Sequence, residues 1–126
     1  MALHLPFDPE SAHVARRRLG DWLRELGTHA EARHDARLLV SELVGNAVRH
    51  ARPLEDGTMQ VSWKHSPQGI DIAVTDGGAL TSPERVDAAS SDTSGRGLAI
   101  VETLSSRWWV ESTRSQTTVH AVLTIA

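Results

Sequence analysis

The chain has 126 residues, of which 40% are hydrophobic and 23% charged, and its formal net charge is -3. This length and composition predict one globular domain over residues 1–126, and the lack of cysteine excludes disulfides and cysteine-ligated zinc. The acidic balance argues against a direct nucleic-acid partner. No run approaches the roughly 18 apolar residues of a membrane span, and the N-terminus lacks a signal-peptide pattern. We therefore expect a cytoplasmic protein without a membrane partner.

The first half of the chain predicts two helices. Residues 8–28 place apolar side chains at helical spacing, and Gly27 would end this helix. Residues 31–51 carry a broader apolar face, and the following Arg52-Pro53 pair would end the second helix. The apolar positions are Ala15, Leu19, Trp22, Leu23 and Leu26 in the first helix, and Ala36, Val40, Leu43, Val44, Ala47 and Ala51 in the second.

The second half predicts strands, one long loop and a short helix. Residues 59–65 and 70–75 read as a hairpin with a turn at 66–69. Residues 77–96 are rich in Gly, Ser, Thr and Asp and resemble a functional lid loop, at about 79–96. A helix over 97–106 and strands over 108–112 and 117–125 follow. This order predicts an α/β (α+β) fold, a two-layer sandwich with helices on one face of the sheet.

The second predicted helix carries the most informative polar residues. Glu42 and Asn46 are four residues apart, about 40° around the helix axis, and Arg49 lies near the same line. An ordinary solvated helix face would explain this arrangement. Asn46, however, is a poor helix former in the middle of a helix. A carboxylate beside a carboxamide oxygen suits a hydrated Mg²⁺ that carries phosphates.

Two further segments have both a structural and a functional interpretation. Asp76 follows a predicted strand, where it could form an Asx turn or accept a hydrogen bond from an amino group such as that of adenine. Residues 95–98 (GRGL) precede an apolar helix, where they could form a simple turn or a phosphate cradle. Either segment alone leaves both interpretations open.

Together these segments resemble a known family. Residues 42–51 (ELVGNAVRHA) resemble the N box of the GHKL ATPase superfamily, and residues 74–78 (VTDGG) and 95–98 resemble the two boxes that follow it. The resemblance implies a Bergerat-type fold with a mixed, mostly antiparallel sheet, and it implies ATP and Mg²⁺ as cofactors. It also assigns a role to single residues. Glu42 would activate the attacking hydroxyl, and Asn46 would ligate Mg²⁺. On the adenine side, Asp76 would hold the amino group, Gly78 would let the base approach, and Thr118 would support the adenine-side carboxylate. Gly95 and Gly97 would border the phosphates, and the nucleotide site would be completed by Arg49, His50, Arg96 and Leu98.

The short chain looks most like the anti-sigma-factor serine kinases of bacteria. That type implies transfer of the ATP γ-phosphate to a serine of an anti-anti-sigma-type antagonist, sequestration of a sigma factor and a possible homodimer. A non-catalytic binding module of the same fold is the main alternative, because Leu80, Ser115 and Gln116 stand where the family usually has glycine. A simple ATPase is the third hypothesis.

Overall fold

The computed structural model describes residues 1–78 and 98–124. The predicted lid, with Leu80, Gly95, Arg96 and Gly97, therefore lies outside the described residues. The elements are β1 (Ala2–Pro6), α1 (Ser11–Leu26), α2 (Ala30–His50), β2 (Thr58–Ser66), β3 (Gly69–Asp76), α3 (Ala99–Leu104), β4 (Arg107–Ser112) and β5 (Thr117–Leu123).

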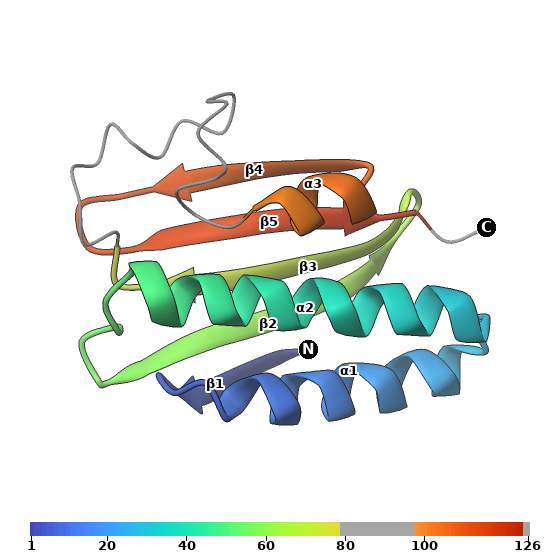
Figure 1. Cartoon of the computed structure of the whole chain (residues 1–126), viewed down its shortest axis with the longest axis horizontal. Helices are drawn as coiled ribbons and strands as arrows, with labels where there is room; N and C mark the ends of the chain where they lie inside the picture. The colour runs from blue at the N-terminus through green and yellow to red at the C-terminus, as the bar shows by residue number, and fades with distance from the viewer. Residues whose placement is uncertain (79–97, 125–126) are drawn as a thin grey trace.

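The five strands form one open sheet in the order β1-β2-β3-β5-β4, and each of its four described pairings is antiparallel. The helices α1, α2 and α3 lie together on one face of this sheet (Figure 1). This arrangement confirms the predicted two-layer sandwich. Strand β1 was not predicted, because only Leu5 of its residues is buried and its extended conformation depends on pairing with the distant β2.

The core lies between the helices and the inner face of the sheet. The helix positions predicted to be apolar supply one side of it, and alternate residues of the strands supply the other. Only Leu26 of those helix positions is exposed, at 45%. The largest fully buried side chains are Trp63, Leu19, Leu23, Leu39, Leu43, Met59, Ile70, Ile72, Val40, Val44, Val61 and Val74.

The ends of α2 and β3 lie on the same side of the molecule (Figure 1). Two backbone hydrogen bonds join the segments that follow these ends. The Arg52 N–H donates to the Gly78 carbonyl at 3.0 Å, and the Gly77 N–H donates to the Arg52 carbonyl at 2.7 Å. The predicted N box and the Asp76 segment are thereby fixed relative to each other. Among the described residues, no helix has the length and apolar character needed to cross a membrane.

Candidate functional site

Asn46 is a buried polar residue on α2 with no hydrogen-bond partner in the described part of the chain. Its exposed fraction is 1%, and both Oδ1 and Nδ2 lack a partner. A buried amide without partners costs roughly 1–3 kcal/mol, so proteins rarely keep one unless a ligand or solvent satisfies it. This burial departs from the solvated-face interpretation at this position, and it leaves a carboxamide oxygen available as a ligand.

The other polar residues of the N box lie at or near the surface of α2. Glu42 is half-buried, and its carboxylate makes no hydrogen bond or ion pair with the described residues. Arg49 is exposed, and its side chain folds back along the helix to Gly45. His50 is half-buried and makes an interaction of its own. The helix thus presents a carboxylate, an amide and a guanidinium within two turns.

Asp76 ends β3 and is 1% exposed. Its Oδ1 accepts a hydrogen bond from the Gly78 N–H at 2.8 Å, which is the Asx-type turn considered from the sequence. Gly78 has a φ of +109°, a conformation that favours glycine, and a Cβ built on it would meet no atom of the described residues within 4 Å. The turn therefore holds the carboxylate and leaves the Cα of Gly78 clear of the other described residues.

Gly77 is a residue that the sequence interpretation missed. A Cβ at this position would lie 2.0 Å from the Pro53 carbonyl oxygen, so only glycine allows the end of β3 to approach the segment after α2 this closely. The sequence shows two adjacent glycines after Asp76, but it does not indicate which of them meets another part of the backbone. Gly77 sets the approach and Gly78 sets the turn.

The strand register corrects the expected role of Thr118. Asp76 pairs with Thr117 and Thr75 pairs with Thr118, so Thr118 lies on the opposite face of the sheet from Asp76. The Thr118 hydroxyl is instead 2.7 Å from the Thr75 hydroxyl. Thr117 is 4% exposed and shares the inner face with Asp76. Thr117 and Thr118 are consecutive in the strand, and the side chains of consecutive strand residues point to opposite faces of the sheet.

Leu98 is the described residue of the glycine box. It is 5% exposed, belongs to the hydrophobic core and immediately precedes α3. Its carbonyl accepts a hydrogen bond from the Glu102 N–H at 2.9 Å. Leu98 therefore anchors the start of α3 in the core. The preceding Gly95, Arg96 and Gly97 lie outside the described residues.

The described residues contain no group of three or more His, Asp or Glu side chains that could enclose a metal ion. Mg²⁺ does not require such a cage, because it is commonly held by one or two protein oxygens together with substrate phosphates and water. The buried, unpartnered Oδ1 of Asn46 fits this kind of coordination.

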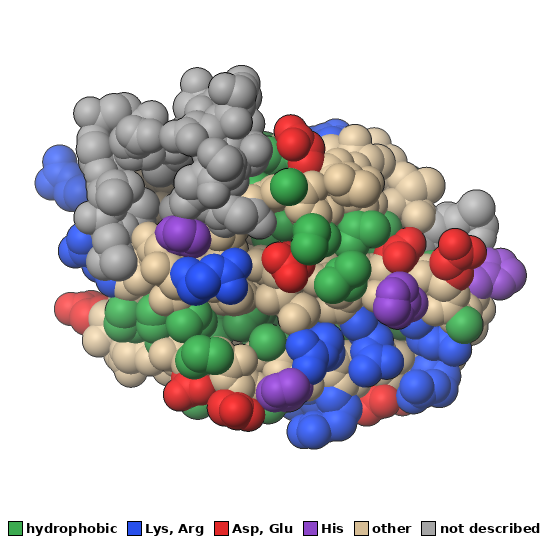
Figure 2. All heavy atoms as spheres, in the orientation of Figure 1, with side chains coloured by type: hydrophobic (Ala, Val, Ile, Leu, Met, Phe, Trp, Pro, Cys, Tyr) green, Lys and Arg blue, Asp and Glu red, His purple; other side chains and the backbone are tan. Residues whose placement is uncertain are grey.

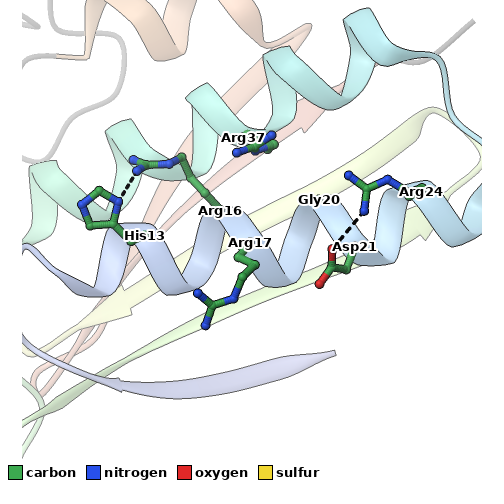
Figure 3. A pocket seen from close by; sticks show the side chains of 7 residues that line it. All are labelled: His13, Arg16, Arg17, Gly20, Asp21, Arg24 and Arg37. Carbon is green, nitrogen blue, oxygen red and sulfur yellow. Dashed lines mark hydrogen bonds and ion pairs between the residues drawn. The ribbon is translucent and has the colours of Figure 1, made fainter.

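A second cluster of charged residues lies between α1 and α2. Figure 2 shows Arg and Lys side chains gathered over this part of the surface, and Figure 3 shows the residues that line a pocket here. The volume of this pocket is about 300 Å³. Arg16 donates a hydrogen bond to the Ser41 hydroxyl of α2 at 2.8 Å, and Arg24 pairs with Asp21 at 3.1 Å. We call this cluster the basic pocket, and its charged and His lining is His13, Arg16, Arg17, Asp21, Arg24 and Arg37.

Comparison with known proteins identifies the family. The histidine kinase-like ATPase domain family matches residues 5–123. The chain belongs to this family. It is 30% identical to a serine-protein kinase RsbW of Listeria innocua in an alignment of 116 residues, and the match covers 82% of this chain and 74% of that protein. The RsbW of Listeria monocytogenes serovar 1/2a is 29% identical over the same lengths.

A solved structure confirms the fold of this histidine kinase-like ATPase domain. The crystal structure of the RsbU and RsbW domains of Rv1364c from Mycobacterium tuberculosis superposes with a TM-score of 0.74 at 24% identity. The superposition covers 99% of this chain but only 32% of the mycobacterial chain. This likeness concerns the fold and not the activity of the longer protein.

Proposed function

We propose that this histidine kinase-like ATPase domain is an ATP-dependent protein serine kinase of the RsbW type. The observation that carries the proposal is the buried amide of Asn46, which has no partner among the described residues and lies one helical turn from the half-buried carboxylate of Glu42. The similarity to proteins named serine-protein kinases supports the kinase over a non-catalytic binding module.

Mg²⁺ fits the residues that are present. In the proposal, the Asn46 Oδ1 would hold the ion, which would supply positive charge to bound nucleotide phosphates. Asp76 holds the adenine amino group, and the turn at Gly78 gives the base room. We assign the phosphate side to Arg49, His50, Gly95, Arg96, Gly97 and Leu98.

Glu42 is the proposed base of the transfer. It takes the proton of a serine hydroxyl as the serine oxygen forms a bond to the γ-phosphorus, and the bond from the γ-phosphorus to the β–γ bridging oxygen breaks to release ADP. Because the Glu42 carboxylate has no partner in the described residues, its proton-accepting oxygens are available for this role. We assign the support of Asp76 to Thr117 in place of Thr118, because the Thr117 side chain lies on the same face of the sheet as Asp76.

The proposed protein partners are a sigma factor and an anti-anti-sigma-type antagonist, met in the cytoplasm and bound by a homodimer of this chain. The basic pocket offers a surface for an acidic patch of such a partner, because Arg17 and Arg37 in it have no ion pair or hydrogen bond within the described residues. Opposite charges across an interface raise association rates and exclude wrong partners.

The test is a capture experiment with the purified, immobilised chain and lysate of its source cell. The proposal expects a small antagonist protein to gain one phosphoserine when Mg-ATP is added, as detected by mass spectrometry, and a sigma factor to be retained. Partner capture without any phosphoserine would favour the binding module. Phosphate release from ATP without a phosphorylated protein would favour a simple ATPase.

A further inference from the structure

Gly45 lies in the middle of α2, between Glu42 and Asn46, and it is half-buried. Glycine in a helix interior is unfavourable relative to alanine, because it loses more backbone freedom on folding. No turn, bulge or positive φ explains its presence, since Gly45 is not among the glycines with positive φ. The space above its Cα is therefore the feature to explain.

The Arg49 guanidinium occupies this space. A Cβ built on Gly45 would lie 3.1 Å from Nη1, 3.7 Å from Cζ and 3.8 Å from Nη2 of Arg49. A contact of 3.1 Å is tighter than ordinary van der Waals packing, so a methyl group at position 45 would push the guanidinium from its place by a few tenths of an ångström. Side chains four residues apart share a helix face and lean toward the N-terminus, which explains how Arg49 reaches back to this position.

This location places the guanidinium beside the catalytic stretch of α2. Gly45 is three residues after Glu42 and directly precedes Asn46, so the three residues span just over one helical turn. Arg49 nevertheless makes no ion pair with Glu42 and no hydrogen bond within the described residues. Its N–H donors therefore remain available for an anion, and the planar guanidinium suits phosphate oxygens.

We infer that Gly45 is a positioning residue whose missing side chain forms the seat of the Arg49 guanidinium and directs it to the nucleotide phosphates. The inference rests on the proposed function for the identity of the anion. Alanine at position 45 would stabilise the helix more than glycine does. The proposed role explains why the chain has glycine there nevertheless.

The experiment compares Gly45→Ala, Arg49→Ala, the double variant and a control, His34→Ala. His34 is an exposed residue of the same helix, where alanine also raises helix propensity without approaching the seat. Gly45→Ala should raise the melting temperature by about 3 °C and still weaken Mg-ATP binding about fivefold, as measured by calorimetry. Arg49→Ala should weaken binding about tenfold, and the double variant should bind like Arg49→Ala alone.

The affinities of the variants and the NMR signal of Arg49 decide the inference. Wild-type affinity in Gly45→Ala, or an equal further loss when Gly45→Ala is added to Arg49→Ala, would overturn it. If the wild type binds no nucleotide, the proposed function fails, and the seat is tested in the nucleotide-free protein by the NMR signal of the Arg49 Nε–H group. A shifted signal in Gly45→Ala, but not in His34→Ala, supports the seat, and an unchanged signal in both removes it.

Discussion

Replacing Asn46 by alanine should separate stability from function. The side chain is 1% exposed, and neither amide atom has a partner in the described part of the protein. Truncating a buried Leu, Ile or Met to alanine costs about 2–5 kcal/mol, and the loss is smaller for Asn because its side chain has fewer apolar atoms. Here the removal of an unpaired buried amide returns about 1–3 kcal/mol, and the better helix propensity of alanine adds about 0.6 kcal/mol. These gains match or exceed a packing and cavity loss of about 1–2 kcal/mol.

We therefore expect Asn46→Ala to be about 1 kcal/mol more stable than the wild type, with a melting temperature about 4 °C higher. The same variant should bind Mg-ATP at least about tenfold more weakly, because it lacks the proposed metal ligand. The difference between wild type and variant should largely disappear when EDTA replaces Mg²⁺.

The assays are thermal unfolding by circular dichroism without nucleotide and calorimetric titration with ATP, with Mg²⁺ and with EDTA. His34→Ala serves as the control, because it reports the helix-propensity gain alone at an exposed position of α2. A variant that loses more than about 1 kcal/mol of stability and keeps its Mg-ATP affinity would refute the reasoning, since Asn46 would then be a packing residue.

Three further predictions concern other parts of the molecule. Gly77→Ala should destabilise the fold by about 3 kcal/mol in urea unfolding, because the new Cβ would lie 2.0 Å from the Pro53 carbonyl oxygen. The control Gly57→Ala should cost about 1 kcal/mol, because a Cβ there meets no described atom within 4 Å and only the φ of +84° is unfavourable. Similar costs for the two variants would contradict the close approach at Gly77. Reversing two charges of the basic pocket, with Arg17→Glu and Arg37→Glu, should cut partner capture about tenfold and leave Mg-ATP affinity unchanged, and full capture by the double variant would exclude the pocket. The pKa of the Asp56 carboxyl should lie below its ordinary 3.8, because the Thr58 hydroxyl and, to a smaller extent, the Thr58 N–H donate hydrogen bonds to it. The contribution of Asp56 to stability is then present above the unfolded pKa and lost as the pH falls through the folded pKa. An NMR titration midpoint at or above 3.8 would contradict this prediction.

The sequence predicted those parts of the fold that depend on local periodicity. The apolar stripe from Ala36 to Ala47 specified which face of α2 is buried, and the alternation of Val119, Ala121 and Leu123 specified the inner face of β5. Strand β1 depends on a partner more than fifty residues away, and Leu5 alone of its residues is buried. A local pattern of that length cannot indicate such a pairing.

The sequence indicates which residue types form the candidate site but does not indicate their geometry. The unusual mid-helix position of Asn46 pointed to a role, and the structure adds the burial that the helix pattern alone did not predict. The choice between Thr117 and Thr118 depends on the register between β3 and β5, which one residue of slippage would reverse. The close approach of Gly77 to Pro53 and the seat at Gly45 are contacts in space, so no spacing rule in the sequence could reveal them.

The central claim is tested most directly by Glu42→Gln in a phosphate-transfer assay with labelled Mg-ATP and the captured antagonist. We expect Glu42→Gln to bind Mg-ATP with the affinity of the wild type and to transfer phosphate to serine at least about 10²-fold more slowly, because the carboxylate acts on the attacking hydroxyl and not on the bound nucleotide. Transfer at the wild-type rate by Glu42→Gln would contradict the account.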